Sequence, residues 1–463
     1  MERDVRRGAR SGEPSRGSDR QPGLTRVLGG KARVEPVKDP LSHEERSAIL
    51  ARPRPLRSLP ILDGPPAADA PKRRYLPLAD PRPSDARYEP LVAVWEVTLR
   101  CDLACRHCGS RAGRARHDEL STEECVDLVR QLAEIGTREV AIIGGEPYLR
   151  DDWTTIIRAI KDHGMRPTMT TGGRGITRER ARAAADAGML AVSVSLDGAR
   201  ETHDRLRGVR GSYDAALAAL GHLREAGVHV AANTQINRLT FPEMPAMVDA
   251  LADVKVRSWQ IQLTVAMGRA VDEPDVLLQP YDLLELQPML AELVPAARAR
   301  GIDVVAGNNV GYFGPHETAL RGRTRAGHSG GCGAGRVSIG IEADGTIKGC
   351  PSLATKTWSG GNVRETPLRD IWERSTALRY TRDRTTKELW GFCATCYYAE
   401  ECKAGCTWTA DALFGKPGNN PYCHHRALEL KKAGLRERIV RVEEAPGLPF
   451  DHGKFDLLVE PLP

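Results

Sequence analysis

Residues 101–108 read CDLACRHC and directly follow a run of strand-forming residues. Three cysteines, Cys101, Cys105 and Cys108, therefore lie within one short loop. Thiolates are the usual ligands of iron–sulfur clusters, and ferredoxin runs supply four of them. Three thiolates this close can hold three irons of a cubane cluster and leave the fourth iron open to a ligand. The alternative is a zinc knuckle, in which His107 would supply the fourth ligand.

A second motif, Gly144-Gly145-Glu146-Pro147, follows the next strand-like run. Glycines let the backbone approach a ligand closely, and proline fixes the turn. A carboxylate or a strand-end carbonyl at this place can accept hydrogen bonds from an ammonium group. An ordinary strand-to-helix turn would explain the motif alone, but it explains less well why the motif accompanies the three cysteines.

Together the two motifs resemble the radical S-adenosylmethionine (radical SAM) superfamily. The resemblance implies that the amino and carboxylate groups of S-adenosylmethionine (SAM) chelate the open iron of a 4Fe–4S cluster. It also implies that an electron from the cluster breaks the S–C5′ bond and releases a 5′-deoxyadenosyl radical. The cofactor carries this chemistry and the protein orients it. The Gly-Gly-Glu-Pro element would bind the amino group of SAM.

The family places further SAM contacts at the ends of later strands. The stretch from Leu263 to Gly268 is expected to approach the adenine, and the usual Thr-Asn-Gly of the third strand reads Thr-Gly-Gly here. Taken singly, each of these strand-end residues is explained equally well as a structural cap of its strand and as a ligand of SAM. The residues of this sequence that match such contacts are Thr171, Ser193, Ser195, Asp197, Arg207, Asn233 and Leu263.

Short β-branched runs alternate with amphipathic helical stretches from about residue 91. The expected strands are Leu91–Val97, Val140–Ile143, Thr168–Thr171, Ala191–Ser195, Val228–Thr234 and Trp259–Leu263. The expected helices between them are Thr122–Ile135, Trp153–His163, Arg178–Ala187, Tyr213–Ala226 and Met244–Leu251. This alternation favours parallel βαβ units, and six of them suit an α/β partial (β/α)6 TIM barrel. Functional groups of such barrels lie at the C-terminal ends of the strands, where both motifs fall.

Seven more cysteines lie between residues 332 and 423. Four of them, spaced C-x2-C-x5-C-x3-C from residue 393, would also fit a zinc ribbon. The whole set resembles the SPASM domain, which carries two auxiliary 4Fe–4S clusters. The resemblance implies a fully ligated cluster held by Cys393, Cys396, Cys402 and Cys423. It implies a second cluster with thiolates from Cys332, Cys350 and Cys406.

The second auxiliary cluster lacks a fourth cysteine, because no cysteine lies between Cys125 and Cys332. We expect an open iron there, a ligand such as His328, or a thiolate of the substrate. Cys125 itself shares an apolar helical stripe with leucines and a valine, which favours a buried structural thiol. The expected cofactors are therefore SAM and three 4Fe–4S clusters.

The chain divides into four expected regions. Residues 1–88 are rich in Pro, Arg, Gly and Ser and are expected to be disordered or to wrap on the rest. Residues 89–310 form the barrel. Its last elements are a helix over Tyr281–Arg300 and a strand over Ile302–Val305, which lead out of it. Residues 311–425 form the SPASM domain, and 426–463 a helix followed by a tail.

Composition limits the remaining functions. A net charge of +6 in 463 residues, without a basic helix carrying aromatic residues, gives no argument for nucleic acid. We find neither a secretory signal nor an apolar run of membrane-spanning length, and we expect a cytoplasmic protein. Eleven cysteines in such a chain indicate metal ligands rather than disulfides.

The resemblance implies an enzyme that takes a hydrogen atom from a peptide or protein, and we expect a peptide maturase that forms thioether or carbon–carbon crosslinks. A small-molecule dehydrogenase and an epimerase are the alternatives. A non-catalytic iron–sulfur scaffold or electron carrier would not need the Gly-Gly-Glu-Pro element. A formylglycine maturase is disfavoured because Pro351, and not Asp, follows Cys350. The expected partners are a ribosomal precursor peptide, an electron donor such as flavodoxin or ferredoxin, and a separate peptide-binding protein. No catalytic side chain can be assigned from the sequence.

Overall fold

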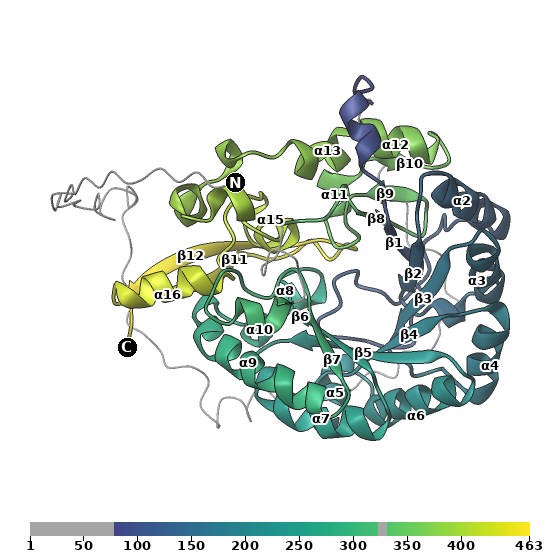
Figure 1. Ribbon diagram of the computed structural model, residues 1–463, viewed down its shortest axis with the longest axis horizontal. Coiled ribbons are helices and arrows are strands. Elements are labelled where there is room, and N and C mark those ends of the chain that lie inside the picture. Colours follow the sequence, from purple (N-terminus) through teal and green to yellow (C-terminus); the bar gives the residue numbers. More distant parts are fainter. Residues whose placement is uncertain (1–77, 323–330) are drawn as a thin grey trace, which may run out of the picture. The chain divides into compact units, whose positions relative to one another are not determined.

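The computed structural model describes residues 78–322 and 331–463, and among them one large sheet dominates (Figure 1). Its strands run in the order β10-β9-β8-β1-β2-β3-β4-β5-β6-β7. The six central strands are parallel and lie where the sequence predicted them. They are β1 Val92–Thr98, β2 Glu139–Gly144, β3 Arg166–Thr171, β4 Ala191–Ser195, β5 His229–Ile236 and β6 Ser258–Leu263, and β7 Asp303–Ala306 follows at the edge.

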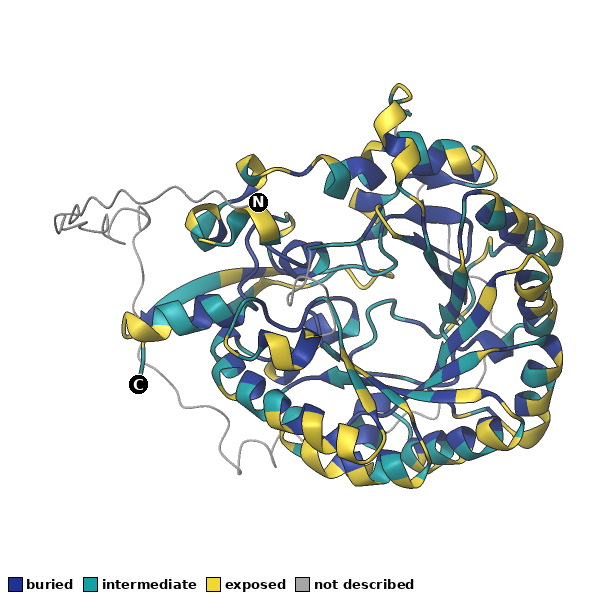
Figure 2. Ribbon diagram, viewed as in Figure 1, coloured by how far each residue is buried: buried dark blue, intermediate teal, exposed yellow. Residues whose placement is uncertain are grey.

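Helices connect successive strands and cover the outside of the curved sheet (Figure 1). They are α2 Thr122–Glu134, α3 Trp153–Asp162, α4 Arg178–Ala187, α5 Arg200–Arg207, α6 Ser212–Glu225, α7 Met244–Asp253, α8 Arg269–Asp272 and α9 Leu283–Ala299. The helix α5 was not predicted. Figure 2 shows that the helix faces turned to the sheet are buried and the opposite faces exposed. The partial TIM barrel expected from the alternation of strands and helices is confirmed.

The helix α2 shows how the pattern produces the packing. Ser121 caps its N-terminus and accepts a hydrogen bond from the amide of Glu124. The Glu124 carboxylate in turn accepts a hydrogen bond from the amide of Ser121. Cys125, Leu128 and Leu132 on its inner stripe are fully buried. Burial raises the pKa of the Cys125 thiol to about 12, so this cysteine stays a neutral core residue, as predicted. In the described part of the chain, no helix is both long and apolar enough to cross a bilayer.

The cysteine-rich region begins by extending the barrel sheet. Strand β8 (Ser338–Ile341) pairs in parallel with β1, so that Val92 faces Ser338 and Trp95 faces Ile341. Strands β9 (Thr346–Lys348) and β10 (Gly361–Asn362) continue the sheet antiparallel. This pairing covers the free edge of β1, which would otherwise expose unpaired backbone groups. The helices of this region are α10 Glu317–Arg321, α11 Thr355–Trp358, α12 Leu368–Arg374, α13 Thr376–Asp383, α14 Ala399–Cys402 and α15 Thr407–Phe414.

Both ends of the described chain pack on this region. Residues before 78 lie outside the described residues, but the short helix η2 (Pro83–Arg87) buries Asp85 against arginines of α13. At the other end, α16 (His424–Lys432) agrees with the predicted helix. The expected tail after it is wrong, because β11 (Leu435–Glu443) and β12 (Lys454–Pro461) form an antiparallel hairpin.

The hairpin escaped prediction because charged residues occupy its buried positions. Arg436 of β11 pairs with Glu460 of β12 at 2.8 Å, and both side chains are buried. Arg426 of α16 pairs with Glu437 at 2.5 Å in the same way. A buried charge is tolerated when it has an oppositely charged partner. Because these ion pairs occupy the buried positions, the sequence lacks the alternation of apolar and polar residues that predicts a strand.

Candidate cofactor and iron–sulfur site

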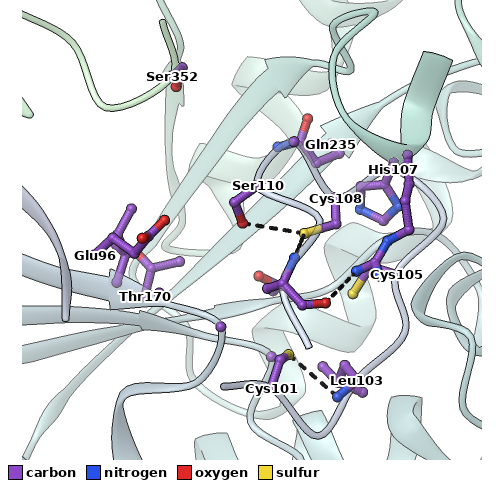
Figure 3. A pocket seen from close by; sticks show the side chains of 18 of the residues that line it. Glu96, Cys101, Leu103, Cys105, His107, Cys108, Ser110, Thr170, Gln235 and Ser352 are labelled. Carbon is purple, nitrogen blue, oxygen red and sulfur yellow. Dashed lines mark hydrogen bonds between the residues drawn. The ribbon is translucent and has the colours of Figure 1, made fainter. Parts of the chain in front are cut away.

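One pocket gathers the two sequence motifs at the C-terminal ends of the barrel strands (Figure 3). The cysteines Cys101, Cys105 and Cys108 all line it, on the loop that follows β1. The predicted SAM-contact residues that line the same pocket are Gly144, Gly145, Glu146, Thr171, Ser195, Arg207 and Asn233. Residues from five strands therefore converge where the sequence predicted a cofactor site.

The three thiols lie in an environment that suits an anionic thiolate site. Burial raises the pKa of Cys101 and of Cys105, although Arg207 opposes it at Cys105. At Cys108 burial also opposes ionisation and is the largest single effect, but Arg269 and the hydrogen bonds from Ser110 and Ala112 together outweigh it, and the pKa is lowered. Arg207 donates from Nη1 to the sulfur of Cys105 at 3.7 Å. Two arginines thus face the thiols, as the negative charge of a thiolate-bound cluster requires.

His107 lines the same pocket as the triad. Its Nε2 lies 3.2 Å from Oδ2 of Asp197, and both side chains are buried. A zinc knuckle would need this imidazole as the fourth ligand. The other ring nitrogen, Nδ1, is buried and has no hydrogen-bond partner among the described residues. A metal-ligating histidine commonly binds a carboxylate through its second ring nitrogen, so this contact is compatible with both the three-thiolate site and the zinc alternative.

Glu146 presents a buried carboxyl group to the pocket. Thr171 donates its hydroxyl to one oxygen, and the amide of Gly172 donates to Oε1 at 2.7 Å. Burial raises the pKa of this carboxyl to about 8 against the hydrogen bond from Thr171. A bound ammonium group would supply the missing positive charge and favour the ionised form. The residues present therefore fit the amino group of SAM.

The Thr-Gly-Gly after β3 has a steric explanation. A Cβ atom on Gly172 would lie 2.2 Å from Cδ1 of Leu103 and 2.8 Å from Oε1 of Glu146. A Cβ atom on Gly145 would lie 2.1 Å from the carbonyl oxygen of Arg100. Both glycines let two strand-end loops meet closely, which brings Glu146 next to the cysteine loop.

Four of the predicted SAM contacts are not among the residues that line the pocket, namely Pro147, Ser193, Asp197 and Leu263. Asp197 is fully buried behind it, where Oδ2 pairs with Arg207 at 2.5 Å and Oδ1 accepts the amide of Gln235 at 2.8 Å. Its pKa is lowered despite burial because Arg207 and His107 favour the anion. After β6, Val265 and Met267 reach the pocket in place of Leu263.

The opposite wall comes from residues that sequence reasoning missed. Ser352, Trp408 and Phe450 line the pocket from the cysteine-rich region and the segment before β12. Trp408 donates from Nε1 to the sulfur of Met267 at 3.2 Å, which joins this wall to the barrel. Figure 3 shows Ser352 on a separate loop from the cysteines. Nothing in the spacing of these residues marked them, because they approach the barrel only in the folded chain.

The remaining cysteines form two groups. Cys393, Cys396, Cys402 and Cys423 line a second, smaller cavity. Burial first, and then Cys393 and Cys396, raise the pKa of Cys402 to about 12. The other group is Cys332, Cys350 and Cys406: burial first, and then Cys332, raise the pKa of Cys350 to about 11 and of Cys406 to about 12. None of the eleven cysteines forms a disulfide.

This grouping is the division that the SPASM resemblance implied. Thiols that raise one another's pKa by mutual repulsion lie close together, and a metal cluster would relieve the repulsion by stabilising the thiolates. Each group offers at least three sulfur donors, which fits iron–sulfur clusters, and His425 also lines the cavity of the four-cysteine group. His328, the expected alternative ligand of the three-cysteine group, lies outside the described residues.

Comparison with known proteins agrees with this geometry. The family model of the radical SAM superfamily matches residues 95–254, and that of the iron–sulfur cluster-binding SPASM domain matches residues 332–397. The Fe-coproporphyrin III synthase of Methanosarcina barkeri is 31% identical over 359 residues, which are 72% of this chain and 87% of that protein. The chain belongs to the radical SAM superfamily. It is an enzyme of that family, with sites for SAM and iron–sulfur clusters.

Two further similarities concern a sequence relative and a solved structure. The PqqA peptide cyclase of Rhizobium meliloti is 28% identical over 341 residues, covering 72% of this chain and 87% of the cyclase. The solved structure of anSMEcpe with bound AdoMet matches with a TM-score of 0.59 at 17% identity, over 73% of this chain and 96% of that one. The structural match supports the radical SAM fold with its C-terminal cysteine-rich region.

Proposed function

We propose that this enzyme uses SAM and three 4Fe–4S clusters to abstract a hydrogen atom from a peptide or protein, as a peptide maturase does. One observation carries the proposal. The pocket that holds the cysteine triad is also lined by Ser352, Trp408 and Phe450 of the C-terminal regions. A substrate in this pocket therefore contacts both the radical SAM barrel and the auxiliary-cluster region.

The proposed roles follow from position. Cys101, Cys105 and Cys108 ligate the first cluster, and Glu146 accepts hydrogen bonds from the SAM ammonium group. Thr171, Ser195 and Asn233 bind SAM from the strand ends, and Arg207 faces its carboxylate. When bound, the cluster and SAM supply a carbon radical that can take a hydrogen atom. The protein orients the substrate carbon and excludes water from the pocket.

The auxiliary sites differ in accessibility. Four cysteines saturate one site, so we propose a closed electron-transfer cluster there. The three-cysteine site lies next to the pocket, because the side chain of Ser352 contacts the Cys350 thiol and also lines the pocket. We propose that residues 89–310 and 311–425 act as the radical-generating and auxiliary-cluster regions. An electron donor such as flavodoxin or ferredoxin would serve them.

Iron analysis tests the cluster assignment. We expect about twelve irons per chain after anaerobic reconstitution, and about eight when all three triad cysteines are changed to Ala. That variant should form no 5′-deoxyadenosine from SAM, whereas the wild type should form it with a chemical reductant. Zinc in place of iron would contradict the proposal.

A peptide substrate is supported by the relative named a PqqA peptide cyclase. The test incubates the reduced enzyme with any short peptide encoded beside its gene and follows the peptide mass. Loss of hydrogen mass that depends on SAM and on Cys105 is expected. An unchanged peptide under conditions that give 5′-deoxyadenosine would count against it.

A tetrapyrrole substrate is the second candidate, because another relative is named an Fe-coproporphyrin III synthase. Titration with iron coproporphyrin III distinguishes the two, since its visible absorbance changes on binding. We expect no saturable change with this chain. A stoichiometric change that is lost in a Trp408→Ala variant would favour the tetrapyrrole and displace the peptide proposal.

A further inference from the structure

Glu96 is a buried carboxylate on β1 that reaches the pocket of the cysteine triad. The residue is only 2% exposed, yet it lines this pocket. Figure 3 shows its carboxyl group directed from the strand toward the interior of the pocket. None of the roles proposed above uses this carboxylate.

The two oxygens of Glu96 differ in their partners. Oε1 accepts hydrogen bonds from Nε and Nη2 of Arg116 at 3.1 and 3.0 Å, and from the amide of Ala343 at 3.4 Å. Oε2 accepts none from the residues that the structure describes. A carboxylate has about four lone-pair sites, so Oε2 keeps its capacity to accept from a ligand in the pocket. Arg116 and Ala343 meanwhile hold the carboxyl group in place.

The charge of Glu96 is only partly compensated. Arg116 is shared by two buried carboxylates, because its Nη2 lies 3.0 Å from Oε1 of Glu96 and 3.2 Å from Oε2 of Glu342. Burial, and then Glu342, raise the pKa of Glu96 to about 7 against the charges of Arg116 and Lys348. A buried charge is stable when it has a partner, so a cation in the pocket would favour the ionised carboxylate.

Aromatic rings line the pocket together with Glu96. They belong to Trp408 and Phe450, and the face of such a ring attracts ammonium and guanidinium groups. The chain already binds one buried cation with this combination. The ammonium group of Lys348 lies 2.8 Å from Oε1 of Glu342 and 3.8 Å from the ring centroid of Phe450. Glu96 and Trp408 offer the same two kinds of group to a ligand.

We propose that Glu96 binds a positively charged group of the substrate, an ammonium or guanidinium of a lysine or arginine side chain. The proposal rests on the peptide function proposed above and narrows its substrate to peptides with a basic residue. Arg207 and Arg269 also line the pocket, but both face the cysteine thiols. A basic side chain bound at β1 would hold the neighbouring carbons of the peptide inside the pocket. Glu96 is therefore a residue that determines specificity.

The test measures peptide binding to the full chain after anaerobic reconstitution, with SAM present and no reductant. The probes are three pentapeptides blocked at both ends, acetyl-Ala-Ala-Xaa-Ala-Ala-amide, in which Xaa is lysine, arginine or the neutral norleucine. Isothermal titration calorimetry gives the dissociation constants. Glu96→Gln keeps an acceptor oxygen for Arg116 and turns an NH2 donor toward the pocket. Glu292→Gln, exposed on α9, is the matched control.

We expect the lysine or the arginine peptide to bind the wild type at least about tenfold more tightly than the norleucine peptide, because hydrogen bonds to charged groups are the stronger ones. The tighter of the two identifies the side chain. Glu96→Gln should remove this preference, and Glu292→Gln should keep it. Equal binding of the three peptides by the wild type, or no binding of any, would overturn the proposal. A preference that persists in Glu96→Gln would do the same.

If Glu96→Gln does not fold, Glu96→Asp decides, because it keeps the charge but withdraws it by one methylene group. The preference should then fall, and an unchanged preference would overturn the role of Glu96. The titration needs no reductant, so its outcome is independent of the peptide-mass test. An unmodified peptide in that test, together with a preference that depends on Glu96, would contradict the maturase reaction and leave the cation site standing.

Discussion

Asp197 and Arg207 form a buried ion pair, with 2.5 Å between Oδ2 and Nη2. Both were predicted from sequence as contacts of SAM. The structure instead places Asp197 behind the pocket, where it holds Arg207 from one side while Cys105 meets the same guanidinium from the other. Asp197 thus orients the arginine that faces the cofactor site. Arg207 lines the cofactor pocket, and Asp197 acts on that pocket only through Arg207.

Replacing Asp197 with Asn should impair both stability and SAM binding. The change leaves Arg207 and His107 without a buried anion, and breaking a buried pair costs about 3–5 kcal/mol. We expect a lower unfolding midpoint in denaturant and a SAM affinity weakened at least about tenfold, a loss of about 1.4 kcal/mol. Equilibrium dialysis with labelled SAM measures the second effect.

Asp253→Asn is the control for this prediction, because Asp253 is exposed at the end of α7. It should leave both quantities unchanged. If the Asp197 variant is destabilised but binds SAM like the wild type, Arg207 does not depend on Asp197 for its position. The ion pair would then be purely structural.

Gly172→Ala should disturb the site through sterics alone. The added methyl group would collide with Leu103 and approach Glu146, so the cysteine loop and the β2 loop must separate. We expect iron to be retained at the auxiliary sites but SAM affinity to fall at least about tenfold. Gly221→Ala on α6 meets nothing within 4 Å and should be neutral or stabilising by about 1 kcal/mol. Equal SAM binding by both variants would show that the loops tolerate the displacement.

The folding pattern was predictable where it is local. Strands and helices of the barrel follow from alternating β-branched runs and apolar stripes, as α2 illustrates. The helix α5 was missed because its sequence RETHDRLR is strongly polar. Of its buried residues Thr202, His203, Leu206 and Arg207, only Leu206 is apolar. The pairing of β8 with β1 joins residues about 240 positions apart, which no local pattern encodes. For the same reason the cysteines were predictable as ligands, but the wall formed by Ser352, Trp408 and Phe450 was not.

Asp85 is the first residue from the N-terminus whose removal we expect to destabilise the fold. Its carboxylate pairs with Arg82, Arg379 and Arg382 at distances of 2.8 to 3.1 Å. We expect removal of residues 1–77 to leave iron content and unfolding midpoint unchanged, because their composition does not favour a core. Removal of residues 1–85 also deletes Asp85 and should destabilise the chain by several kcal/mol, as breaking a buried pair does.

Thermal unfolding and iron analysis of the two truncations check this prediction. Asp85→Asn in the full chain should reproduce the effect of the longer truncation. Equal stability of the two truncated chains would show that η2 contributes nothing to the fold. Loss of iron on removal of residues 1–77 would show that the segment is needed for the folded enzyme.

Glu96 should make stability depend on pH. It lines the pocket, and burial, with the charge of Glu342, raises its pKa to about 7 against Arg116 and Lys348. Because the pKa of Glu96 is higher in the folded state than in the unfolded state, the folded state binds the proton more tightly. This stabilisation is fully present at pH values below the pKa of the unfolded chain. This contribution, at most about 3.5 kcal/mol, is lost as pH rises through about 7. Glu96→Gln cannot lose a proton, so its unfolding midpoint relative to the wild type should increase between about pH 5 and about pH 8. A difference that stays constant over this range would show that Glu96 does not titrate there.

The three-cysteine site should respond to an added thiol. Cys332, Cys350 and Cys406 supply only three thiolates, and Ser352 places this site at the pocket wall. Iron at an open position favours a soft sulfur ligand. In the chain with Ala at the three triad cysteines, we expect the auxiliary spectrum to change on addition of 2-mercaptoethanol and to stay unchanged with ethanol, its oxygen-only counterpart.

The rival is a ligand from the protein, for which His328 is the nearest candidate in sequence. His328→Ala separates the two explanations, because an imidazole ligand must leave a spectral change when it is removed. If the thiol has no effect and His328→Ala shifts the spectrum, the site is an electron relay closed by the protein. If the thiol acts on wild-type and His328→Ala chains alike, the open iron faces the pocket. A cysteine-bearing peptide should then give the same change as the small thiol, because both would offer sulfur to the same position.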